Sequence, residues 1–150
     1  MPSEPVSLPA GNPQVGFSIP DKVRLFVEIL FAYARVRRIL YCYELPRAVE
    51  LLRSARCEPN RRFGEEELVA GGGWRYALAV VKVLRLLPAD SRCLVRSLVL
   101  MHVLARRGAE TTFVLGVIPE PEFTAHAWIE HRGVPLLKPG RTGDGRLLEL

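Results

Sequence analysis

The chain has 150 residues, 49% of them hydrophobic, a composition that excludes a disordered protein and is enough for one domain with its own core. Its formal net charge is +5, but the 18 arginines among its 21 basic residues are spread along the chain. Since no zinc-finger spacing or RNA-binding aromatic signature accompanies them, the charge does not predict a nucleic-acid-binding protein. An acidic peptide or protein partner suits the same charge.

Three cysteines, Cys42, Cys57 and Cys93, are an odd number without a CxxC pair. This pattern predicts neither a disulfide framework nor a metal site. Residues 1–20 are rich in proline, glycine and serine, and they lack the basic start and apolar core of a signal peptide. We therefore expect a flexible segment over 1–20, and free thiols in a cytoplasmic protein.

An apolar run over residues 21–40 predicts a long helix, with Asp21 as a candidate N-cap. Four charged residues of this run, named below, interrupt it, so that no uncharged stretch is long enough for a membrane span. Helical spacing places them roughly on one face, so that the rest of the helix can be buried. The alternative is a helix that docks a partner or lies on a membrane surface. The charges are Arg24, Glu28, Arg35 and Arg38.

Two further helices are predicted in the first half of the chain. One covers residues 45–56, with Pro46 in its first turn. The other covers 74–87 and is stopped by Pro88. The glycines at 71–73 predict a flexible break, and since no Lys-Ser or Lys-Thr follows them they do not form a phosphate loop.

The next helix is predicted to be buried. Asp90 or Ser91 can cap its start, and it runs to about Arg107 and ends at Gly108. Apolar residues cover most of its circumference, which is typical of a helix in the centre of a domain.

Strand patterns follow this helix. Residues 111–118 are β-branched and aromatic, and residues 123–131 alternate between two faces. Shorter strands are expected at 134–138 and 146–150. The order of helices and then antiparallel strands predicts a single α+β domain over 21–150. We expect a helical part over 21–89 and a core with the functional residues over 90–150.

Cys93 is expected two or three residues inside its helix. The unpaired N–H groups and the positive dipole end favour an anion there, and the thiolate is the nucleophilic form of cysteine. His126 lies in the middle of a strand of the first β pair, so a sheet packed on the helix N-terminus can present it as a base. The residues alone leave two alternatives equally open: a catalytic Cys93, and a buried inert thiol.

The other histidines and cysteines have a weaker context. His102 is nine positions beyond Cys93 and therefore on the opposite side of the helix. His131 lies at a turn and is expected to be exposed. Cys42 and Cys57 are expected to be structural.

The run SRCLVRSLVLMHVLARRG, followed by TTFVLGV and AHAWIEHRGVPLL, resembles the lasso-peptide leader peptidases. These are the B2 proteins, or the C-terminal part of fused B proteins. The resemblance covers residues 91–137. The helical half resembles the family only in having apolar, arginine-rich helices. It implies a transglutaminase-like, papain-related fold with a central Cys-bearing helix on a small antiparallel sheet, and a cysteine endopeptidase that removes the leader from a ribosomally made precursor.

The same resemblance implies partners and roles. A B1 leader-recognition protein carries the leader to the peptidase, and a lasso cyclase acts afterwards; no cofactor is implied. Cys93 attacks the scissile carbonyl, and His126 takes the thiol proton and later protonates the departing amine. The Cys93 backbone N–H helps to hold the oxyanion. Trp128 is either a wall of the site or a substrate contact.

A third residue should orient His126. A three-residue hairpin loop at 131–133 would place His126 opposite Lys138, where the resembling family carries Asp or Glu. A lysine ammonium only donates hydrogen bonds, so Lys138 cannot accept the imidazole N–H. Glu130, on the same face of the strand, and Asp144 are the candidates. Glu149 is more remote, and a main-chain carbonyl can also serve.

Two other functions are compatible with the sequence. One is a non-enzymatic or impaired peptide-binding module on the same fold, in which Cys93 is buried and Lys138 marks a lost triad. The other is acyl transfer between peptides by the same Cys–His pair.

Overall fold

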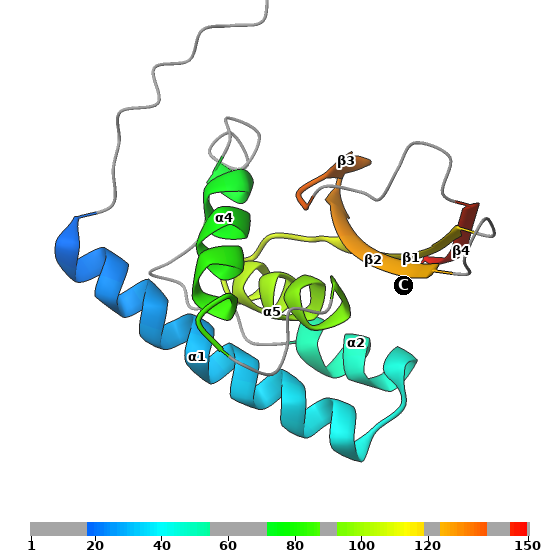
Figure 1. Ribbon diagram of the computed structural model, residues 1–150, viewed down its shortest axis with the longest axis horizontal. Coiled ribbons are helices and arrows are strands. Elements are labelled where there is room, and N and C mark those ends of the chain that lie inside the picture. Colours follow the sequence, from blue (N-terminus) through cyan, green and yellow to red (C-terminus); the bar gives the residue numbers. More distant parts are fainter. Residues whose placement is uncertain (1–17, 55–71, 88–92, 119–123, 138–144, 150) are drawn as a thin grey trace, which may run out of the picture.

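A computed structural model describes residues 18–54, 72–87, 93–118, 124–137 and 145–149 (Figure 1). Within these ranges helices come first and strands follow, and α5 lies between the other helices and the sheet (Figure 1). The sheet is antiparallel with the order β3-β2-β1-β4. This arrangement confirms the predicted α+β class. The elements are α1 Ile19–Cys42, α2 Leu45–Arg53, α4 Gly73–Leu84, α5 Cys93–Ala105, β1 Thr112–Ile118, β2 Thr124–His131, β3 Val134–Pro135 and β4 Gly145–Glu149.

Helix α1 begins earlier than the sequence predicts. Ser18 is its N-cap residue and Pro20 lies in the first turn, where proline replaces an N–H that has no helical partner. Asp21 is therefore a first-turn residue and not the cap. None of the described helices is long and apolar enough to cross a membrane.

The buried face of α1 includes a charge, so the prediction that its four charges share an exposed face is wrong for Glu28. Glu28 is 7% exposed and accepts two hydrogen bonds from Arg107, at 2.8 and 2.7 Å. Arg107 also donates to the Val103 carbonyl, and its guanidinium carbon lies 4.6 Å from the ring centroid of Tyr76. Burial lowers the pKa of Arg107, but the hydrogen bonds and charge of Glu28 outweigh it and raise this pKa overall. The pair thus joins α1 to the end of α5.

Gly73 belongs to α4, so the predicted flexible break does not include it. Gly72 has helical φ and ψ angles, and Gly73 is the first residue of α4. A Cβ atom on Gly73 would lie 3.0 Å from the Leu136 side chain. The missing side chain lets α4 approach the segment after β3. The helix ends at Leu84, earlier than predicted, and Gly71 and Pro88 lie outside the described residues.

Two further helix predictions are tested only in part. Pro46 lies in the first turn of α2 as predicted, and this helix ends at Arg53. The predicted caps Asp90 and Ser91 lie outside the described residues. Helix α5 ends at Ala105, before the predicted Arg107, but the predicted stop signal at Gly108 is confirmed: Gly108 has a φ of 79°, and hydrogen bonds from its N–H and the next residue's N–H close the last turn.

The β2–β3 hairpin has a shorter loop than predicted. Glu130 pairs with Pro135 and His131 with Val134, so only Arg132 and Gly133 form the turn. Both have positive φ, 51° and 78°, as a two-residue type I′ turn requires. The predicted three-residue loop is therefore wrong by one position, and a shift of one position reverses which face each side chain occupies. This removes the basis for placing residue 138 opposite His126.

Candidate functional site

Cys93 lies against the part of β2 that carries His126. It is the first residue of α5 that the structure describes, and its side chain is partly exposed. The Ala127 N–H donates to Cys93 Sγ at 3.4 Å, and Sγ lies 4.0 Å from the Ala125 carbonyl oxygen. Ala125 and Ala127 flank His126, so the helix start and this strand meet where the sequence predicts. In the described ranges no hydrogen bond joins Cys93 to His126 directly.

A second polar side chain of α5 fixes this contact. Ser97, one turn after Cys93 and fully buried, donates its hydroxyl proton to the Ala127 carbonyl oxygen at 3.0 Å. Both backbone groups of Ala127 are therefore bonded to α5. Further along the same edge of β2, the Leu136 N–H donates to the Ile129 carbonyl at 2.9 Å. Helix α5 thus covers an edge of β2 beyond the short β3 and satisfies its polar groups.

Our sequence reasoning missed Ser97. A signal was present, because residues four positions apart share a helix face. Ser97 is four positions after Cys93, so the two polar side chains share one face of α5.

The indole of Trp128 forms a wall beside His126. The two ring centroids are 6.0 Å apart, with an interplanar angle of 24°. Trp128 is 4% exposed, so its burial favours the wall over a substrate contact. Its Nε1–H donates to Glu130 Oε1 at 2.9 Å, which holds the ring in place.

Glu130 is therefore a partner of Trp128. It shares the face of His126, but four residues of strand place the two Cα atoms about 13 Å apart. Trp128 lies between them along the strand. The other residues considered for the third position, Asp144 and Lys138, lie outside the described residues, and of Glu149 only the backbone is described.

The other two histidines lie away from Cys93. His102 faces α2, where its Nδ1 is 3.2 Å from the Leu52 carbonyl oxygen. Burial is the main cause that lowers the pKa of His102; the Leu52 hydrogen bond raises it, and the Arg35 and Arg106 charges lower it. His131 was predicted to be exposed, but the structure buries part of it. Its Nδ1 donates to the Glu110 carbonyl at 2.7 Å.

Cys42 lies away from this site. Cys42 is exposed at the end of α1, and Cys57 lies outside the described residues. The described residues contain no group of three or more His, Cys, Asp or Glu side chains that could hold a metal ion.

The geometry thus offers a partly exposed thiol at the start of a buried helix, with a histidine on the adjoining strand. Neither a curated protein nor a solved structure matches the chain. The family model described as Transglutaminase-like superfamily matches residues 27–145, so the match includes the helical half as well as Cys93 and His126. On this match, and with an α+β fold that agrees with it, the chain belongs to the transglutaminase-like superfamily.

Proposed function

We propose that the protein is a cysteine endopeptidase that removes the leader peptide from a lasso-peptide precursor, together with a leader-recognition protein. The observation that carries the proposal is the contact of Cys93 Sγ with the backbone on both sides of His126. Enzymes of the transglutaminase-like superfamily are in general cysteine proteases and transferases. The resemblance of residues 91–137 to leader peptidases supports the narrower substrate class.

In the proposed reaction, Cys93 and His126 share two steps. The Cys93 sulfur attacks the scissile carbonyl carbon, and its proton passes to His126. The C–N bond then breaks, His126 protonates the departing amine, and a thioester joins the leader to Cys93. Water, deprotonated by His126, hydrolyses this thioester and releases the leader carboxylate.

The surroundings of Cys93 support these steps. Its backbone N–H, at the helix start, is the group proposed to stabilise the oxyanion. Ser97 holds α5 against β2 through the Ala127 carbonyl, which keeps the sulfur at the strand that carries His126. Trp128 limits the movement of the His126 ring on one side. We propose Asp144 or a main-chain carbonyl as the group that orients His126.

Leader cleavage followed by mass spectrometry tests the proposal. The assay combines the protein with the precursor and the recognition protein encoded beside its gene. Cys93→Ala should abolish cleavage, lowering the rate by at least about 1,000-fold. Cys42→Ala is the matched control, since Cys42 is an exposed thiol outside the site, and it should keep full activity. Equal activity in wild type and Cys93→Ala would refute a cysteine peptidase.

The same assay addresses the position of Lys138. Faster cleavage by Lys138→Glu would mean that this position supports His126 when it carries an acid. Loss of cleavage in Lys138→Glu would mean that the lysine itself has a role and that another group orients His126.

Product mass separates hydrolysis from acyl transfer. Hydrolysis adds the mass of one water across the cleaved bond, whereas transfer joins the leader to an amine through a new amide. Precursor binding without any product would favour the non-enzymatic module, and Cys93 should then resist iodoacetamide under conditions that label Cys42.

A further inference from the structure

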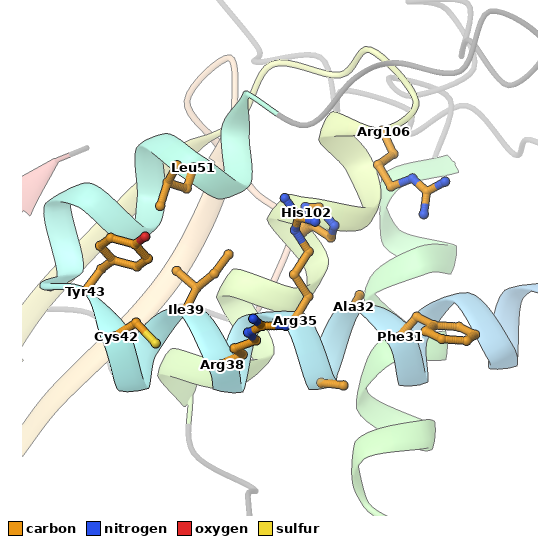
Figure 2. Close-up of a pocket in the computed structure, with 11 residues that line it drawn as sticks. Phe31, Ala32, Arg35, Arg38, Ile39, Cys42, Tyr43, Leu51, His102 and Arg106 are labelled. Carbon is orange, nitrogen blue, oxygen red and sulfur yellow. The ribbon is translucent and has the colours of Figure 1, made fainter.

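A groove far from Cys93 lies between α1, α2 and the C-terminal half of α5 (Figure 2). It encloses about 1010 Å³, as large as the biggest small-molecule sites. Its charged lining residues are Arg35 and Arg38 of α1 and Arg106, which directly follows α5, and no acidic residue lines it in the described part of the chain. Two of these arginines, Arg35 and Arg38, have no ion-pair partner in the described ranges.

His102 forms the inner end of this groove. Its side chain is 4% exposed, and its Nδ1 is engaged by the Leu52 carbonyl. Arg35 extends from α1 toward His102, and Arg38 lies one turn further along α1 (Figure 2). The side walls include the aromatic rings of Phe31 and Tyr43. The groove therefore combines fixed positive charge with apolar contact area.

An apolar ridge on α1 leads into the groove. The ridge consists of Val23, Val27 and Phe31, which are exposed and spaced four residues apart, so they share one helix face. The next residue in this series is Arg35, and Phe31 belongs to both the ridge and the groove. The outward face of α1 thus changes from apolar to basic along its length. Contiguous exposed apolar side chains next to charges are typical of protein interaction sites.

We infer that the ridge and the groove form one docking surface for a partner protein, which places an apolar stretch on the ridge and an acidic stretch in the groove. An acidic partner is chosen because of charge complementarity, since every charged side chain in the lining is an arginine. The ridge adds apolar area that a purely electrostatic site does not need. This inference concerns binding alone and does not rest on the proposed function.

Fluorescence anisotropy with the full chain tests the inference. The probe is a fluorescein-labelled synthetic peptide of about 16 residues, with leucines at helical spacing in one half and glutamates in the other. We expect saturable binding that weakens from about 50 to about 200 mM NaCl, because salt screens exposed charges. A peptide with lysines in place of the glutamates should not bind. Binding of both peptides, or of neither, would overturn the inference.

Two variants with matched controls locate the site. The double variant Arg35→Glu, Arg38→Glu should weaken probe binding by at least about tenfold, because it turns attraction into repulsion. Its control, Lys82→Glu on α4 with Arg85→Glu at the C-cap of that helix, changes the net charge equally outside the groove and should have less than about a twofold effect. Equal weakening by both would mean non-specific charge attraction and overturn the inference.

The apolar half has its own pair of variants. Phe31→Ala should weaken probe binding about fivefold, as expected for one aromatic anchor of an interface. Leu86→Ala is matched in exposure, 73% against 71% for Phe31, and lies outside the ridge, so it should have no effect. Circular dichroism and unfolding midpoints should be unchanged in all of these variants, because the altered residues are exposed. An unchanged affinity of Phe31→Ala would remove the ridge from the docking surface.

Two further experiments test whether the groove binds an acidic segment other than one of a partner protein. The chain carries its own acidic run at residues 65–67, outside the described residues. If replacing these three glutamates by glutamine tightens probe binding tenfold or more, the chain's own segment occupies the groove and the partner inference fails. If the unlabelled precursor peptide displaces the probe at concentrations near the probe's own Kd, the groove belongs to the substrate, and the partner inference fails again.

Discussion

The two ends of α5 have different surroundings, although one buried helix connects them. At its start, Cys93 and Ser97 bond to the backbone of Ala127 in β2. Toward its end, His102 and Arg106 line a basic groove with α1 and α2. The residues between them are buried on all sides. A helix packed this tightly fixes the position of both ends, so each end can carry a separate function on one rigid element.

Replacing His126 should separate the two ends most clearly. His126→Ala should lower leader cleavage by roughly 100-fold or more, because a general acid–base contributes at least that much. Binding of the acidic probe peptide should stay unchanged, since the groove lies at the other end of α5. Cleavage rates and anisotropy on the same preparation provide the comparison. A loss of probe binding in this variant would show that the two ends are coupled.

The next largest effect should come from the buried ion pair that joins α1 to the groove end of α5. Glu28→Ala leaves the Arg107 guanidinium buried without its carboxylate, and should lower the free energy of unfolding by about 3–5 kcal/mol. Urea unfolding measures the change. The exposed pair of Arg47 and Glu50 is the control, and Glu50→Ala should cost no more than about 1 kcal/mol. A similar loss of unfolding free energy in both variants would show that burial does not make the Glu28–Arg107 pair more important than an exposed pair.

Removing the Ser97 hydroxyl should have a smaller effect at the other end of the helix. Ser97→Ala leaves the Ala127 carbonyl without this donor and should cost about 1–3 kcal/mol in the free energy of unfolding. As a positioning residue for Cys93, Ser97 should affect kcat more than KM. Ser54→Ala removes an exposed hydroxyl that bonds the Leu51 carbonyl, and it should change neither quantity. A KM effect alone would assign Ser97 to substrate binding.

The sequence predicts the α+β class, the stop signal at Gly108 after α5 and the two long strands, because each rests on local signals. Hydrophobic periodicity, a glycine with positive φ and β-branched runs act within a few residues. The placement of Cys93 beside the strand of His126 follows from one packing assumption, that the sheet covers the helix start.

The errors have two sources: contacts between residues far apart in the sequence, and one unusual residue in a turn. Glu28 was expected on an exposed face because charge patterning cannot show that Arg107, 79 residues later, would neutralise it in the core. The hairpin loop was expected to be one residue longer, because Arg132 is an uncommon residue at positive φ. The ends of α5 show the same limit: no local pattern pairs Ser97 with Ala127, or brings Arg35 next to His102.

The smallest predicted effect is a pH dependence that originates at the groove end. Burial lowers the pKa of His102 below its ordinary value of 6.5. Below about pH 6.5 the unfolded chain therefore binds a proton at His102 that the folded chain resists, so this residue makes the free energy of unfolding fall as the pH falls. The facing charges are Arg35, Arg106 and Glu28, and the Leu52 carbonyl accepts from the ring.

In His102→Asn an amide can donate to that carbonyl, but no proton titrates. Urea unfolding of both proteins between about pH 5 and pH 8 should therefore give a shallower decline in the variant. Equal slopes would mean that His102 is protonated as readily in the folded chain as in the unfolded one, and that the groove is open enough to solvate its charge.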